Sequence, residues 1–193
     1  MDVLLSLLQV APILAAMIGL AAMGGWASER GGIVNIALEG KALMAALAAA
    51  WVAERSGAVA SVLAAVAAAT LLSVVHWAAT QKLRIDHVVS GMAINLVAAG
   101  VTGSLATPAD VAGRSGATFS PWVYVALAAV SPIVLALVAD RTRFGLRLVA
   151  TGADPDKARL MGIRPARVRL VAMLLTGLFC GLAGALVYTY TAN

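Results

Sequence analysis

Long stretches of apolar residues constrain this chain more than any other feature of its sequence. A helix needs about 20 mostly apolar residues to cross the hydrocarbon layer of a membrane. Six stretches approach or reach this length, at residues 3–23, 36–53, 58–79, 88–105, 122–139 and 170–190. Apolar and polar residues do not alternate within them, which disfavours a β-barrel. The sequence therefore predicts an all-α, polytopic bundle of about six transmembrane helices, forming a single domain over residues 1–193.

The composition agrees with lipid as the solvent for much of the protein surface. Hydrophobic residues make up 62% of the chain and charged residues only 12%, whereas soluble domains carry about a quarter charged residues. The lone cysteine, Cys180, is expected to be a small buried apolar side chain. Small residues spaced four or three apart, which let membrane helices approach closely, occur at Ala15 and Gly19 and at Gly177, Gly181 and Gly184.

Basic residues concentrate in one segment between two predicted spans. Residues 140–169 hold eight Lys and Arg against three Asp, and loops with such an excess stay in the cytoplasm. Counting back from it places the loop at 82–84 and the turn at 28–30 inside as well. The N-terminus and the loop at 107–121 then lie outside. Because the net charge of +5 belongs to these loops, without interleaved aromatic residues, we do not expect nucleic-acid binding.

The basic segment also has the features of a short helix. Asp154 is a good N-cap, Pro155 fits the first helical position, and Gly162 is placed to end the helix. The small apolar face of this helix is expected to consist of Ala158, Leu160 and Met161. From the residues alone two interpretations stay open: a basic loop that sets topology and touches anionic lipid, or a docking helix for a soluble partner.

The same segment resembles the cytoplasmic coupling loop of ABC importer permeases, in the family that serves branched-chain amino acids, ribose-like sugars and nucleosides. The resemblance implies that a partner ATPase grips the short helix and moves the spans through it. The positions that carry this coupling role by resemblance are Gly145, Arg147, Gly152, Asp154, Pro155, Ala158, Gly162 and Ile163, with Leu146 in the matching Gly-Leu-Arg entry.

Two further segments, residues 28–40 and 86–95, are similar to the nucleoside-type subgroup of this family. The resemblance implies a nucleoside importer in a bacterial-type plasma membrane. Its expected partners are a cytosolic ATP-binding-cassette ATPase, a second permease subunit and an extracytoplasmic solute-binding protein. ATP and Mg are expected in the ATPase, with no cofactor bound by this chain. Permeases of the family continue for several more helices, so the resemblance also implies a chain truncated or split at its C-terminal side.

Polar residues inside the predicted spans are candidates for a solute path, because such groups are costly at membrane depth. Asn35 and Glu39 are four residues apart and share a helix face. Gly31–Gly32 before them could break the helix, and broken helices often line substrate sites. The alternative for Glu39 is an ion pair with Lys41 or Arg30. The predicted path residues are Asn35, Glu39, Ser90 and Asn95, the last with an interhelical hydrogen bond as its alternative.

The sequence lacks the motifs of an enzyme. Gly40–Lys41 is followed by Ala42 rather than the Ser or Thr of a phosphate-binding loop, and we predict no catalytic residue and no metal site. His76, beside Trp77, is expected to be an interfacial residue. Two other functions stay open: a secondary transporter driven by an ion gradient, which needs a carboxylate or histidine deep in a span, and a membrane scaffold that transports nothing.

Overall fold

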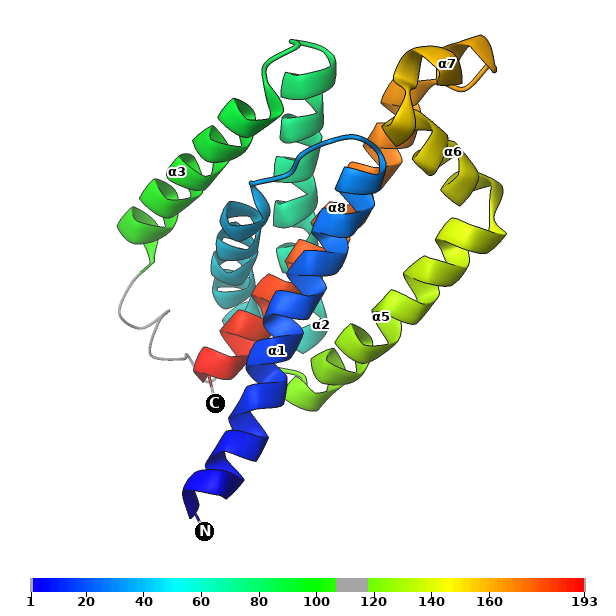
Figure 1. Ribbon diagram of the computed structural model, residues 1–193. Coiled ribbons are helices and arrows are strands. Elements are labelled where there is room, and N and C mark those ends of the chain that lie inside the picture. The colour runs from blue at the N-terminus through cyan, green and yellow to red at the C-terminus, as the bar shows by residue number, and fades with distance from the viewer. Residues whose placement is uncertain (1, 107–117, 193) are drawn as a thin grey trace.

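The computed structural model describes residues 2–106 and 118–192, and every regular element in that part of the chain is a helix. Five helices are long and apolar enough to cross a membrane, judged by length and composition: α1, α2, α3, α5 and α8. The elements are α1 (Asp2–Arg30), α2 (Leu38–Gln81), α3 (His87–Leu105), α5 (Pro121–Arg141), α6 (Arg143–Ala153), α7 (Pro155–Leu160) and α8 (Pro165–Ala192) (Figure 1). The predicted all-α transmembrane bundle is confirmed.

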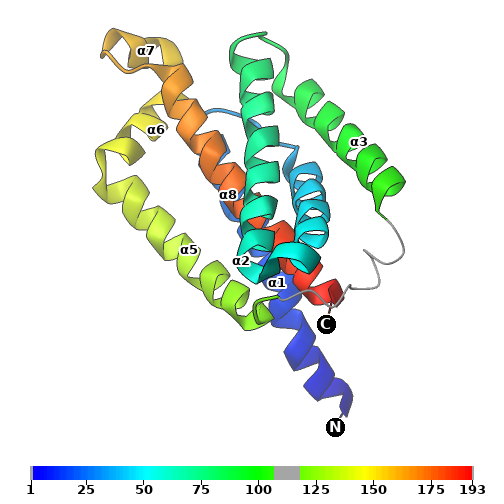
Figure 2. The ribbon, with the colours of Figure 1, turned by 180° about the vertical axis from the view of Figure 1, so that it is seen from behind.

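The longest helix, α2, is broken at Gly57. This residue has φ 78° and ψ 178°, a conformation that glycine adopts without the steric cost of a side chain. The chain folds back there. The reversal brings the Ser61 hydroxyl to the Ala49 carbonyl, to which it donates a hydrogen bond at 3.0 Å. Figure 2 shows the reversal at the end of the molecule remote from α7. The two arms correspond to the predicted spans 36–53 and 58–79, so five helices agree with about six spans.

Helix α8 lies at the centre of the bundle, packed against α1 and α2. The helices α3 and α5 flank this centre on opposite sides, with α3 on α2 and α5 on α1 (Figures 1 and 2). Small residues allow the central contact: a Cβ on Gly177 would lie 2.5 Å from the Thr70 Cα, and one on Gly181 would lie 2.5 Å from the Val66 Cα. Close packing is thus confirmed for the glycines of α8. It is not found at Gly19, where a Cβ would meet nothing within 4 Å.

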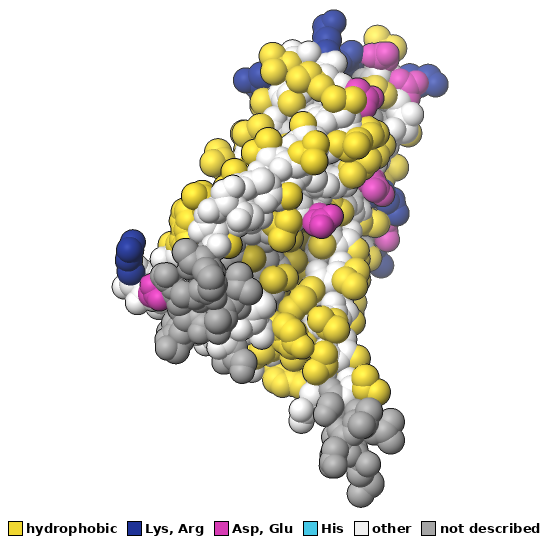
Figure 3. Space-filling view, turned by 90° about the vertical axis from the view of Figure 1, so that its left-hand side faces the viewer, with side chains coloured by type: hydrophobic (Ala, Val, Ile, Leu, Met, Phe, Trp, Pro, Cys, Tyr) yellow, Lys and Arg dark blue, Asp and Glu magenta, His cyan; other side chains and the backbone are white. Residues whose placement is uncertain are grey.

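Charge and hydrophobicity divide the surface into a body and an end. Hydrophobic side chains cover much of the body in Figure 3, and charged side chains of both signs crowd at the end that carries α7. The C-terminal ends of α1 and α2 also lie at this end of the molecule, where Arg169 donates hydrogen bonds to both Gly31 and Gln81. The structure thus brings together the three segments for which the sequence predicts a shared cytoplasmic side.

Candidate functional site

Helix α6 fixes the candidate docking segment to the bundle. The Thr142 hydroxyl accepts a hydrogen bond from the Gly145 N–H at 3.1 Å and caps the helix. Leu148 is buried against Val168 and Ala172 of α8. Because three turns of α6 bury one side in this way, the short helix that follows has a rigid base.

Helix α7 has the caps that the sequence predicts. The Asp154 carboxylate accepts hydrogen bonds from the N–H groups of Asp156 and Lys157, each at 3.0 Å. The bond from the Lys157 N–H holds the pKa of Asp154 below its ordinary value. At the other end Gly162 has φ 76°, and the N–H of Ile163 donates to the Ala158 carbonyl at 3.0 Å. This is the bonding pattern of a glycine-terminated helix.

The apolar face of α7 is smaller than expected from the sequence. Leu160 is 89% exposed and Met161 76% exposed, as the prediction requires. Ala158 is only 2% exposed, so its assignment to this face is wrong. Ala158 and Leu160 are two residues apart, and at 3.6 residues per turn such side chains point to nearly opposite sides of a helix.

Arginines surround the exposed apolar tip. Two hollows beside α7 share Gly162, Ile163 and Arg164 in their linings. Exposed basic side chains border these hollows, namely Arg147, Arg159, Arg164 and Arg167. Asp156 is also exposed at this end and pairs with Arg159 at 2.7 Å. The end of the molecule therefore presents an apolar point beside a mainly basic arginine rim, a surface suited to a partner with an apolar groove and acidic edges.

Two glycines of the docking segment lie where backbones meet. A Cβ on Gly145 would collide with the backbone of Ala139 at the end of α5. A Cβ on Gly152 would collide with the Arg30 carbonyl at the end of α1. At these two points α6 meets the ends of α5 and α1 through backbone atoms.

Gly31 and Gly32 lie in the turn between α1 and α2, which joins two separate helices of opposite direction rather than interrupting one (Figure 1). Asn35 lies in the non-helical stretch before α2, so the predicted helix face shared by Asn35 and Glu39 is wrong.

Gly32 has φ 77°, and the N–H of Ile33 returns to the Ser28 carbonyl at 3.1 Å to close α1. Helix α2 begins only at Leu38 and lacks a side-chain cap from Ala37. The backbone between them is therefore irregular within the bundle.

Asn95 of α3 supplies the missing cap. Its side-chain oxygen accepts a hydrogen bond from the Gly40 N–H at 2.9 Å, and its amide nitrogen donates to the Ile36 carbonyl at 3.0 Å. Both bonds cross between elements. Asn95 thereby holds the first turn of α2 in place.

Asn35 turns into the protein and binds a buried lysine. Its amide nitrogen donates to the Ser28 hydroxyl at 3.2 Å. Its oxygen accepts from the Lys41 ammonium at 3.1 Å. Lys41 is fully buried, so the alternative of a Glu39–Lys41 pair near the interface does not hold. Arg30 instead lies over the Trp26 ring, 5.1 Å from its centroid.

The structure gathers the four predicted path residues around the irregular segment, but their side chains have different surroundings. Glu39 is exposed beside an apolar hollow of about 380 Å³ between α1, α2 and α8. Ser90 is buried next to Gly91, which lies against Ile36 and Ala37. The side chains of Asn35 and Asn95 are engaged by the protein itself. A role of these four in solute passage stays a prediction.

Two buried residues were not recognised as unusual from the sequence. Lys41 was noted only as a pairing partner, although a lysine inside an apolar stretch is itself a signal. His76 is fully buried, and neither of its ring nitrogens has a hydrogen-bond partner among the residues that the structure describes. His76 lies five residues before the end of α2, so its position near the membrane interface stays a prediction. Its neighbour Trp77 donates to the Ala166 carbonyl at 2.8 Å and so fixes the second arm of α2 to α8.

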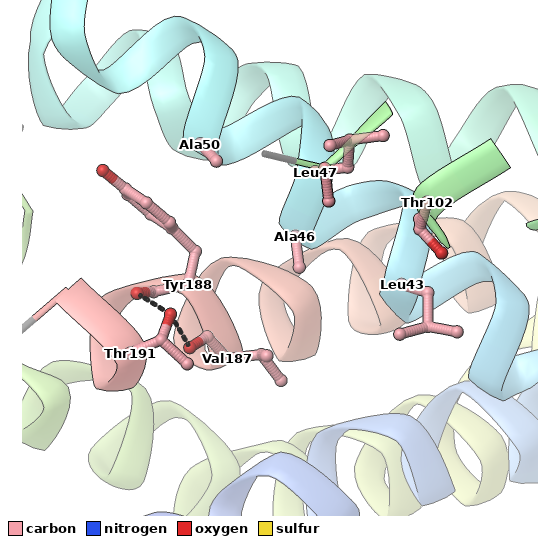
Figure 4. A pocket seen from close by; sticks show the side chains of 9 residues that line it. Leu43, Ala46, Leu47, Ala50, Thr102, Val187, Tyr188 and Thr191 are labelled. Carbon is pink, nitrogen blue, oxygen red and sulfur yellow. Dashed lines mark hydrogen bonds between the residues drawn. The ribbon is translucent and has the colours of Figure 1, made fainter. Parts of the chain in front are cut away.

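Another apolar hollow lies between the first arm of α2, α3 and the end of α8. Its volume is about 180 Å³, and Figure 4 shows Leu43, Leu47 and Tyr188 among the side chains around it. The hydroxyls of Thr102 and Thr191 donate to carbonyls of their own helices. A ligand site usually offers polar groups that converge on the solute. This hollow is therefore a weaker candidate than the segment at Glu39.

These features define a multi-pass helical membrane protein with an irregular segment between α1 and α2 and a short capped helix, α7, at one end of the bundle. Comparison with known proteins identifies the family: the sequence profile described as branched-chain amino acid transport system / permease component matches residues 7–193, and the chain belongs to this family. No solved structure matches the chain significantly.

Relatives in three organisms are about a third identical to this chain within the aligned residues. The guanosine ABC transporter permease protein NupQ of Bacillus subtilis is 33% identical over 99% of this chain and 70% of its own length. The nucleoside ABC transporter permease protein NupC of Lactococcus lactis is 31% identical over 85% of this chain and 61% of its own. The putative glucose ABC transporter permease protein TsgC13 of Haloferax volcanii is 30% identical over 89% and 59%, respectively.

Proposed function

We propose that this chain is the membrane-spanning permease subunit of an ATP-driven importer for nucleosides in a bacterial plasma membrane. A cytosolic ABC ATPase, which binds ATP and Mg, supplies the energy. A second permease subunit completes the path, and an extracytoplasmic solute-binding protein delivers the solute. The family match and the similarity to the guanosine permease NupQ and the nucleoside permease NupC support the solute class.

The exposed tip of α7 carries the proposal. A helix of six residues has little stability of its own, yet α7 is capped at both ends and exposes Leu160 and Met161 to the surroundings. Large apolar side chains at such exposure are typical of a binding surface when a polar rim encloses them. We therefore place the ATPase contact at this tip and its arginine rim.

Co-purification with the ABC ATPase of the same importer tests the contact. Leu160→Glu combined with Met161→Glu should weaken ATPase association by about 30-fold or more, the scale of an interface hot spot. Both side chains point away from the bundle, so the fold should survive. Leu83→Glu is a matched control, because Leu83 is 71% exposed at the same end of the molecule. Unchanged association of the double variant would refute the docking site.

We further propose Glu39 as the residue of the predicted set that faces the solute. Its carboxylate lies at the start of α2 and is exposed. The side chains of Asn35 and Asn95, by contrast, hold the irregular segment next to it. A carboxylate can accept hydrogen bonds from the hydroxyls of a ribose. Glu39→Gln should therefore weaken solute uptake while ATPase association stays intact.

An ion-gradient-driven transporter is the second candidate, and the burial of His76 favours it. A histidine inside a span without hydrogen-bond partners is a candidate proton site. Uptake measured after an uncoupler has collapsed the ion gradient, with ATP levels maintained, separates the two mechanisms. Persistent uptake supports the ABC importer, and collapse of uptake supports the alternative.

A further inference from the structure

Arg169 ties three helices together at the end of the molecule that carries α7. It lies in the first turns of α8, half-buried. Its Nε donates a hydrogen bond to the Gly31 carbonyl at 2.9 Å, and its Nη1 donates to the Gln81 side-chain oxygen at 2.8 Å. Gly31 follows the end of α1, and Gln81 is the last residue of α2. One guanidinium group therefore spans α8, α1 and α2.

The turn that Arg169 holds is also the turn against which α6 rests. A Cβ on Gly32 would lie 3.2 Å from the Arg169 Nη2 and 3.2 Å from the Gly152 Cα. The docking segment, the α1 terminus and the guanidinium therefore meet at one point. The side chains of Leu148 and Ala172 also lie against this turn, at Gly31. A movement of α6 would therefore press on the turn that the bonds of Arg169 hold.

Beyond this turn the chain reaches the start of α2 within five residues. Ile33 is fully buried there. Asn35 is bound to Ser28 and Lys41, and Asn95 binds the backbone of Ile36 and Gly40. A segment held at this many points transmits a displacement rather than absorbing it. The turn is thus connected mechanically to the first arm of α2 and to Glu39.

We propose that Arg169 is the positioning residue through which movement of the α6–α7 docking segment reaches the irregular segment before α2. This inference rests on the proposed importer function. An arginine suits the role, because its planar group offers donors in fixed, divergent directions and stays charged in proteins. A lysine at the same place has a single ammonium on a flexible stem and cannot reproduce both bonds with the same geometry.

The test is the number of solutes moved per ATP hydrolysed in proteoliposomes that hold the complete complex. Arg169→Gln should lower this ratio about tenfold, the scale of a residue that modulates coupling between sites, while ATPase association persists. Arg169→Lys should give an intermediate ratio. Arg84→Gln is the matched control: it removes the same charge from an exposed arginine at the same end and should leave the ratio unchanged.

A second measurement separates transmission from a purely structural staple. Ile36→Cys, in a Cys180→Ala background, reports on the irregular segment, because Ile36 is 43% exposed. Its reactivity with a maleimide should change when ATP binds to the complex with Arg169 present. The change should vanish in Arg169→Gln. A staple without a role in transmission would leave the ATP-dependent change intact and would overturn the inference.

Gln81→Leu keeps the inference testable even if Arg169→Gln fails to fold. It removes one acceptor and leaves the guanidinium in place, so it should lower the transport ratio partially. An unchanged ratio in both Gln81→Leu and Arg169→Lys would refute the proposal. A wild-type complex that binds no ATPase would instead refute the proposed function, which makes the two failures distinguishable.

Discussion

The Asn35 side chain connects the two sides of the irregular segment between α1 and α2. Asn35 donates to Ser28 on the α1 side and accepts from the Lys41 ammonium on the α2 side. Lys41 has no ion pair among the described residues, and its ammonium donates a hydrogen bond to the Asn35 side-chain oxygen at 3.1 Å. Burial of a cationic group without a partner is expensive. The local structure therefore depends strongly on this one contact.

Replacing Asn35 by Leu should destabilise the protein by about 3 kcal/mol, because it leaves a buried ammonium and a hydroxyl without their partner. The measurement is thermal unfolding of the purified protein in detergent. Adding Lys41→Met should recover part of the loss, since the second change removes the stranded cation. A double variant less stable than Asn35→Leu alone would show that the ammonium does not need this amide.

At the scale of single elements, what the sequence could predict depends on how local the interactions are. The caps of α7 involve residues within nine positions, so Asp154, Pro155 and Gly162 predicted both its ends. The contacts of Arg169 and Asn95 join residues far apart in the chain, and no local pattern indicates their partners. For the same reason the burial of Lys41 and His76 was missed: which side of an all-apolar helix faces inward depends on its neighbours.

The contact between α2 and α8 gives a prediction for one element pair. Gly177→Leu should disrupt folding or lower stability by at least about 2 kcal/mol, because the added atoms would enter the Thr70 backbone. Gly19→Leu is the matched control, since an added Cβ there meets nothing within 4 Å. Yield and thermal stability in detergent provide the comparison. Equal loss in both variants would mean that helix propensity or insertion, not packing, determines the effect.

At the scale of the whole molecule, the fold separates two ends. The turn at Gly57 lies at one end, and the α6–α7 segment lies at the other (Figures 1 and 2). The six apolar stretches predicted this alternation, although the structure joins two of them in one broken helix. The side of the membrane that each end faces follows from the basic residues and stays a prediction.

Cysteine labelling tests that orientation. In a Cys180→Ala background, Ser56→Cys should react with a membrane-impermeant maleimide in intact cells. Leu160→Cys should react only after the membrane is opened, because the basic end stays in the cytoplasm. Cells without the partner ATPase avoid protection of position 160 by docking. Labelling of Leu160→Cys from outside would invert the topology and remove the docking proposal with it.

The position of Lys41 also has a consequence for synthesis. Met173 of α8 covers Asn35, the hydrogen-bond partner of Lys41: its sulfur lies 3.9 Å from the Asn35 amide nitrogen. Met173 follows Asn35 by 138 residues in the chain. During translation the first arm of α2 therefore emerges long before its cover exists. Until α8 is inserted, the first arm of α2 can pack only against the insertion machinery or the second arm of α2. The final packing around Lys41 should therefore form only after α8 has been inserted.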